Sequence, residues 1–165
     1  MKQHLLTLII PLAIIFLGGC RGGMEEFTFT YSVESINNYK IVCSFDSDKT
    51  YKIEGYNYFM DNSAGIRAPH IKEGVLTESE YAQTVSHLKA GRLFAMKDAY
   101  GFETEPEGIM GDMLYQITLT TDGRSKHITI RNSEANRFPQ PFIELLRYIN
   151  DFLKANPLPT SPPLN

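Results

Sequence analysis

Cys43 is the first residue to consider for covalent chemistry, because a thiolate becomes a nucleophile when a nearby histidine accepts its proton. The candidate bases are His70, His87 and His127. These histidines are far apart along the chain and lack the short ligand pairs typical of zinc sites. Cys43 itself belongs to an apolar row of period two, and a buried cysteine behaves as a small hydrophobic side chain. The pattern therefore favours a core residue over a nucleophile.

A group of carboxylates lies in the Gly- and Pro-containing segment 101–112 and forms the second candidate site. Calcium takes about six to eight oxygen ligands, so a calcium-stabilised domain is one hypothesis, although the spacing matches no calcium loop. A pair of carboxyl groups could also serve glycoside hydrolysis, which makes an envelope hydrolase the enzymatic alternative. A charge run is more often a solvated surface, here one that a partner could contact. The candidate binding residues are Glu103, Glu105, Glu107 and Asp112, and we predict no metal or cofactor.

Cys20 follows a segment with the three parts of a secretory signal. Lys2 gives a positive start, the 13 residues from Leu5 to Leu17 are mostly apolar, and two small glycines precede Cys20. A transmembrane helix needs about 20 apolar residues, so this run is too short to span a bilayer. Pro11 would also break its helix. The pattern predicts a removable export signal over residues 1–19.

The four residues Leu17-Gly18-Gly19-Cys20 resemble the lipobox of bacterial lipoproteins. The resemblance implies that the Cys20 thiol carries a diacylglyceryl group and that a dedicated peptidase cuts before Cys20. It also implies attachment to a cell-envelope membrane through acyl chains, which hold durably when two or three are present. Arg21 replaces the Asp that commonly retains such proteins at the inner membrane, which favours the outer membrane where the cell has one.

Charge and cysteine use limit the function classes. Without the signal, 15 basic residues oppose 19 acidic ones, a net charge of −4 that argues against nucleic acid as a partner. It also argues against binding of anionic lipid by a polybasic segment, so the acyl chains must anchor the protein. With Cys20 lipidated, Cys43 has no partner for an intramolecular disulfide. The fold must therefore be stabilised by its core.

Strands are predicted where apolar and polar residues alternate between turn residues. The first places Phe27, Phe29, Tyr31 and Val33 on one face, and Asp122-Gly123 between two such segments predicts a tight hairpin. The predicted strands are 27–33, 39–45, 49–54, 56–60, 114–121 and 126–131, with a short extended piece in 92–100 and a loop over 61–74.

Two helices complete the prediction. Thr77 and Glu80 form a capping-box pattern that starts a helix ending near Gly91, with an apolar stripe of Tyr81, Val85 and Leu88. The second helix spans 141–155. Because strands and helices are segregated and the connections are short, the sequence predicts an α+β fold: a mainly antiparallel sheet with two helices packed on one face.

The expected organisation is a removable signal (1–19), a lipidated tether (20–26), one α+β domain (27–155) and a Pro-rich disordered tail (156–165). From Tyr39 to Leu153 the chain resembles a family of short bacterial lipoprotein domains of uncharacterised function, a resemblance that implies no activity. The matching segments are Tyr39 to Ile41, Tyr51 to Gly55, Thr77 to Ala90, Phe94 to Tyr100, Tyr115 to Ile130 and Pro141 to Leu153.

The sequence contains no Gly-rich phosphate loop and no Gly-x-Ser-x-Gly nucleophile elbow. We therefore expect a non-enzymatic envelope domain that binds a protein partner or another envelope component. The predicted working surface combines the loop from Asp61 to Gly74 with the acidic loop from Gly101 to Gly111.

Overall fold

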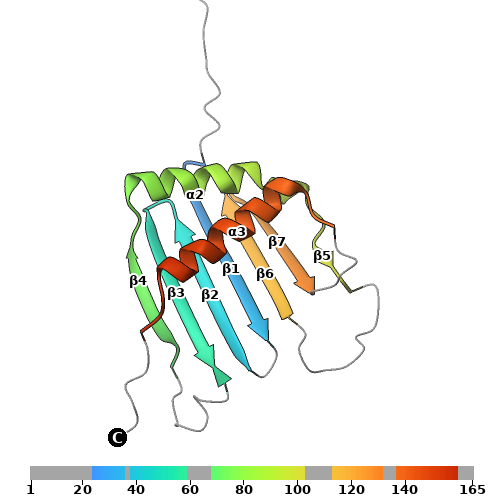
Figure 1. Ribbon diagram of the computed structural model, residues 1–165. Coiled ribbons are helices and arrows are strands. Elements are labelled where there is room, and N and C mark those ends of the chain that lie inside the picture. The colour runs from blue at the N-terminus through green and yellow to red at the C-terminus, as the bar shows by residue number, and fades with distance from the viewer. Residues whose placement is uncertain (1–23, 36–37, 59–67, 103–112, 132–136, 160–165) are drawn as a thin grey trace, which may run out of the picture.

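A computed structural model describes residues 24–35, 38–58, 68–102, 113–131 and 137–159. Within these ranges, seven strands form one sheet in the order β4-β3-β2-β1-β6-β7-β5, shown in Figure 1. Every neighbouring pair is antiparallel except β5 and β7. The strands are β1 (Phe27–Ser35), β2 (Tyr39–Asp46), β3 (Thr50–Asn57), β4 (His70–Val75), β5 (Ala99–Tyr100), β6 (Met113–Thr121) and β7 (Arg124–Arg131).

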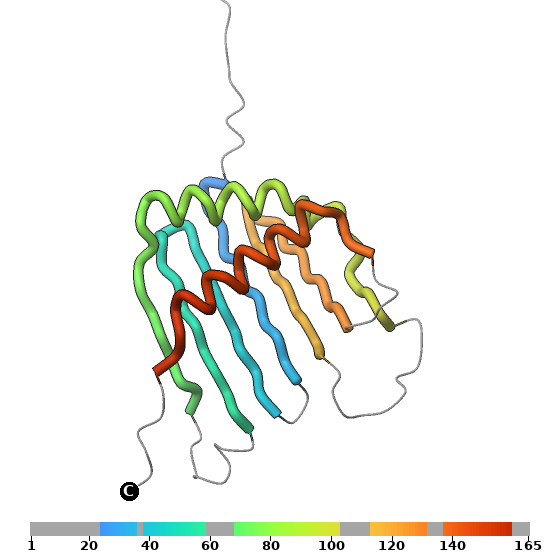
Figure 2. Tube along the Cα trace, in the orientation of Figure 1, coloured from blue at the N-terminus to red at the C-terminus, as the bar shows by residue number. Residues whose placement is uncertain are grey.

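In the part of the chain that the structure describes, two α-helices and one short 3-10 helix accompany the sheet. They are α2 (Glu78–Ala90), η1 (Leu93–Ala95) and α3 (Gln140–Ala155). The α+β class and the mainly antiparallel sheet are confirmed. Figures 1 and 2 show α2 running across the ends of the strands and α3 crossing the sheet diagonally.

One face of the sheet forms the core, because alternate residues of each strand point to the same side. The predicted inward row of β1 is confirmed, with Phe27, Phe29, Tyr31 and Val33 all buried. Core residues of neighbouring strands and helices complete it: Cys43, Phe45, Ile53, Leu88, Leu93, Ile117, Leu119, Ile128, Ile130, Phe142, Leu145, Ile149 and Phe152.

Aromatic contacts fix where the helices meet the sheet. The Phe152 ring of α3 lies 5.0 Å from the Phe45 ring and 5.1 Å from the Tyr51 ring, both edge to face. The C-terminal half of α3 therefore covers β2 and β3. Tyr81 of α2 stacks on Phe27 at the start of β1, with ring centroids 6.2 Å apart.

The predicted capping box and tight hairpin are both confirmed. The Glu80 carboxylate accepts a hydrogen bond from the Thr77 backbone N–H at 2.8 Å, and the Glu80 N–H donates to the Thr77 hydroxyl at 3.2 Å. Asp122 and Gly123 have φ values of 50° and 70°, as a two-residue hairpin turn requires.

The end of α2 differs in detail from the expected glycine cap. Gly91 keeps a helical φ of −63°, and Arg92 takes the left-handed conformation instead. Gly91 lies close to α3, because a Cβ there would lie 3.1 Å from the Leu145 side chain, a tight contact.

Two strand predictions were wrong. Tyr56 and Asn57 belong to β3 and do not begin a separate fourth strand. The predicted loop 61–74 contains most of β4, which starts at His70. The sequence predicts Gly74 to be a loop residue, yet it lies within β4 and pairs with Tyr51 of β3. The Tyr51 ring covers Gly74, so a Cβ there would lie 2.6 to 2.7 Å from ring atoms and the hydroxyl of Tyr51.

Packed residues extend beyond both predicted domain ends. Met24 and Leu158 contact the core, and Leu158 fills the space above Gly55 that a side chain would otherwise occupy. Three residues separate Cys20 from Met24, so the two can be at most four residue steps, or about 14 Å, apart.

Candidate functional site

Cys43 and the three candidate histidines lie on different elements, with Cys43 on β2, His70 at the start of β4, His87 on α2 and His127 on β7. Cys43 is fully buried, which confirms the core interpretation, and burial raises the pKa of its thiol to about 12. His87 stacks on Tyr148 between the helices, with ring centroids 4.7 Å apart, and His127 lies exposed on β7. In the described ranges, no three His, Cys, Asp or Glu side chains are placed to hold a metal ion.

The other predicted site residues lie outside the described residues. These are the lipidation residue Cys20 and the acidic-loop residues Glu103, Glu105, Glu107 and Asp112. The structure does place the strand ends beside the two predicted loops. Asn57 pairs with Tyr39, and Met113 pairs with Ser35, so both strand ends lie at the same end of the sheet. Phe27 and Thr121 pair at the opposite end.

The face of the sheet opposite the core row is mainly polar, and we call it the open face. Directly paired residues of antiparallel strands point to the same side, so the register defines its cross-strand rows. One row runs Ser125, Thr120, Thr28 and Asp46, and it continues through the hydrogen bonds of Asp46 to Thr50, which pairs with Val75. The next row runs His127, Thr118, Thr30, Ser44, Lys52 and Glu73. Short hydroxyl side chains therefore occupy its centre.

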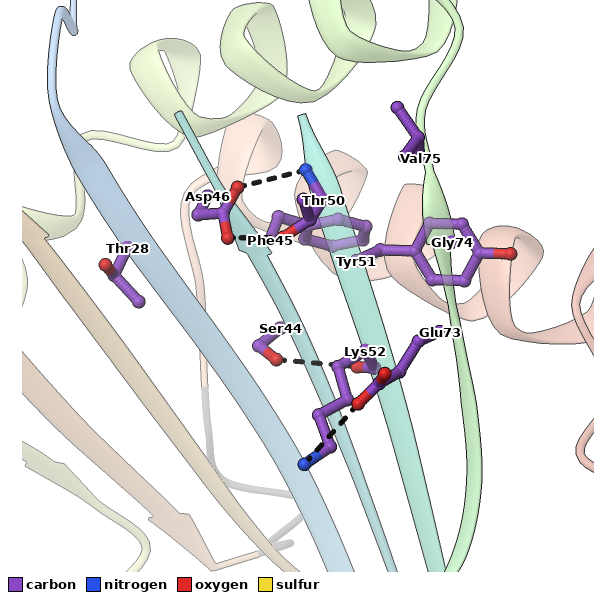
Figure 3. Close-up of a pocket in the computed structure, with 10 residues that line it drawn as sticks. All are labelled: Thr28, Ser44, Phe45, Asp46, Thr50, Tyr51, Lys52, Glu73, Gly74 and Val75. Carbon is purple, nitrogen blue, oxygen red and sulfur yellow. Dashed lines mark hydrogen bonds and ion pairs between the residues drawn. The ribbon is translucent and has the colours of Figure 1, made fainter. Parts of the chain in front are cut away.

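A hollow of about 580 Å³ opens on this face over β1 to β4. Figure 3 shows its lining, with Thr28, Ser44, Lys52 and Glu73 arranged across the four strands. Lys52 forms ion pairs with Glu54 at 3.2 Å and Glu73 at 3.8 Å. The hydrogen bond to Glu54 raises the pKa of Lys52, which therefore stays cationic.

Asp46 lines the hollow at the turn between β2 and β3. Its carboxylate accepts backbone hydrogen bonds from Asp48 and Thr50, both at 3.0 Å, and also contacts the Thr50 hydroxyl. These bonds stabilise the turn, as expected for Asp in a hairpin. The hollow offers hydroxyl groups, one ammonium and carboxylates beside a larger apolar surface, to which Phe45, Tyr51 and Val75 contribute. It is suited to a partner surface that presents both apolar and polar groups.

A second polar arrangement lies on the β6–β7 side of the open face. The His127 ring is hydrogen-bonded to the Thr118 hydroxyl at 2.9 Å and to the Thr129 hydroxyl at 3.2 Å. Thr120 and Ser125 are hydrogen-bonded at 3.1 Å in the neighbouring row. These hydrogen bonds link neighbouring polar side chains on this part of the face.

Sequence reasoning did not identify the hollow. Lys52, Glu73 and Asp46 belong to no sequence motif that would single them out. The available signal was the polar half of each alternating strand, which faces away from the core. The hollow also needs β4 beside β3, and β4 was predicted to be loop.

No protein-family model and no curated protein matches this chain. Among the described helices, none is both long enough and apolar enough to cross a membrane.

Proposed function

We propose that this protein is a lipoprotein of the bacterial cell envelope, anchored by acyl chains on Cys20, whose domain binds an envelope protein without catalysis. The lipobox-like segment supports the anchor, and Arg21 favours the outer membrane where one exists. The observation that carries the binding function is the hollow on the open face, which combines apolar surface with polar side chains of β1 to β4.

The edge of the sheet next to the hollow favours a protein as the partner. Within the described residues β4 is one of the two edge strands, so no strand lies beside it on the side away from β3. Ile71 and Val75 point to the open face and are 43% and 71% exposed. Exposed apolar side chains beside polar groups are typical of protein interfaces, and a free edge can accept an extended segment.

The direction of the chain indicates how an anchored domain would face the membrane. Met24, the first described residue, leads into β1 at the end of the sheet where Phe27 and Thr121 pair. The strand ends next to the predicted loops lie at the other end. An anchor at Cys20 would therefore place those loops away from the membrane, where a partner can reach them.

We also propose that α2 and α3 form a single layer on the core face of the sheet. Contacts between α2 and α3 support it, because the Tyr148 and Thr84 hydroxyls lie 2.6 Å apart and both contact the Glu80 carbonyl oxygen. That layer would leave the open face free for binding.

Site-specific photocrosslinking in cells tests the binding surface. A photoreactive side chain at Thr30, in the centre of the open face, should give one defined protein adduct. The same group at Asn150, exposed on α3, is the matched control and should give none. Lys52→Glu should reduce the Thr30 adduct, because it reverses the charge that pairs with Glu54 and Glu73.

Equal adducts from Thr30 and Asn150, or a Thr30 adduct unaffected by Lys52→Glu, would count against the open face as the binding surface. Folding of each variant is checked by its thermal unfolding midpoint, so that a misfolded domain is not mistaken for lost binding.

A further inference from the structure

A second hollow, of about 340 Å³, lies where the chain enters the domain. Met24 is at its edge, and Leu88, Leu93 and Leu119 provide an apolar lining from α2, η1 and β6. It is on the core side of the sheet, since Leu119 belongs to the core row. An anchored Cys20 would be within about 14 Å of this hollow.

Three cations surround the apolar lining. Lys89, Arg92 and Arg124 all line the hollow and are exposed. Arg124 lies over the Phe94 ring, 4.4 Å from its centroid. Among the described residues, none of the three cations forms an ion pair with a carboxylate. The hollow therefore combines an apolar interior with uncompensated positive charge.

Thr121 adds a polar group to this lining. Its hydroxyl is buried and has no hydrogen-bond partner, and it is the only such side-chain atom in the described part of the chain. Leaving a buried hydroxyl unpaired is unfavourable, so a ligand group that hydrogen-bonds to it would bind better. Apolar lining, cations and an unpaired hydroxyl together fit an amphiphile with an anionic head.

Acidic residues at the same end are on a different side. Glu25, Glu26, Asp48 and Asp122 line a neighbouring hollow together with Thr28 and Thr120 of the open face, and Thr121 borders both hollows. The charges at the end nearest the anchor are thus divided, positive beside α2 and negative beside the open face. A net charge of −4 does not reveal this division.

We propose that this basic hollow binds an anionic phospholipid of the membrane that holds Cys20. The phosphate contacts Lys89, Arg92 and Arg124, and part of an acyl chain contacts the apolar lining. The domain then tilts with α2 and η1 against the lipid and the acidic side away from it, which turns the open face outward. This inference rests on the proposed lipid anchor.

The test uses the full lipidated protein, reconstituted in phosphatidylcholine vesicles with or without phosphatidylglycerol. Amide hydrogen exchange is measured for residues 88–96. The proposal predicts slower exchange only in the vesicles that contain phosphatidylglycerol. Each membrane-proximal cation contributes about fivefold to such association, so the Lys89→Glu/Arg124→Glu variant should lose the extra protection.

The matched control is Arg147→Glu/Lys154→Glu, which makes the same charge change on exposed positions of α3 and should retain the protection. Equal exchange in the two vesicle types, or equal loss in both double variants, would overturn the lipid site. The mass of Cys20 is measured in the same sample. An unmodified Cys20 would refute the anchor, whereas an acylated Cys20 with charge-independent exchange would refute only the lipid site.

Discussion

Phe152 is the side chain whose removal should weaken the fold most clearly. It is 7% exposed and contacts both Phe45 and Tyr51 edge to face. We therefore predict that Phe152→Ala strongly destabilises the domain, because α3 loses its main contact with β2 and β3.

The size of the effect follows from the burial and the two ring contacts. Removing a buried Phe costs about 3 to 5 kcal/mol, a range that includes the cavity left behind. Edge-to-face pairs add about 0.5 to 1.5 kcal/mol beyond burial, which places Phe152→Ala in the upper part of that range, at about 4 kcal/mol. With an m-value of about 2 kcal/mol per molar urea, the unfolding midpoint should fall by about 2 M.

Equilibrium urea unfolding, followed by circular dichroism, measures this midpoint. Ile143→Ala is the control, because Ile143 lies on the same helix but is 37% exposed. It should cost about 1 kcal/mol or less, since the part of the side chain that stays in water loses little burial energy. A loss below about 1 kcal/mol for Phe152→Ala would contradict the packing of α3 on β2 and β3.

Three further predictions follow from local contacts. Gly74→Ala should destabilise the domain by about 1 to 3 kcal/mol in urea unfolding, because the new methyl group displaces the Tyr51 ring, whereas Val75→Ala next to it should have little effect. Thr77→Ala should cost about 1 kcal/mol at neutral pH through loss of the capping box. The hydrogen bonds from Thr77 lower the pKa of Glu80, so their stabilisation is present at neutral pH and is lost as acid protonates Glu80. The difference in unfolding free energy between the wild type and Thr77→Ala should therefore shrink as the pH falls. A difference that stays constant with pH would argue against the cap. Cys43 should react with a thiol reagent only on unfolding, because burial raises its pKa to about 12, and rapid reaction of the native protein would contradict the core position.

Much of the sheet was predictable because its strands have one buried face. Alternation placed the inward residues of β1, and the Asp122-Gly123 turn placed the β6–β7 hairpin. The start of α2 was equally accessible, since the Thr77 and Glu80 side chains satisfy backbone groups locally. These features depend on neighbours in sequence.

The strand β4 and the hollow depended on distant contacts. Gly74 reads as a turn residue until the ring of Tyr51, 23 positions earlier, covers it. The hollow combines Thr28 with Glu73, which no local pattern connects. The cluster of Lys89, Arg92 and Arg124 near Met24 could not be predicted from the sequence for the same reason, because Arg124 comes from a hairpin and Lys89 from a helix.

The lipid on Cys20 is the central claim, and intact mass spectrometry of the protein purified from cell membranes tests it most directly. We predict that the chain begins at Cys20 and carries the added mass of a diacylglyceryl group, with or without a further acyl chain. Cys20→Ala should retain residues 1–19, carry no lipid and incorporate no labelled palmitate. A wild-type chain that starts elsewhere, or starts at Cys20 without lipid, would contradict the account.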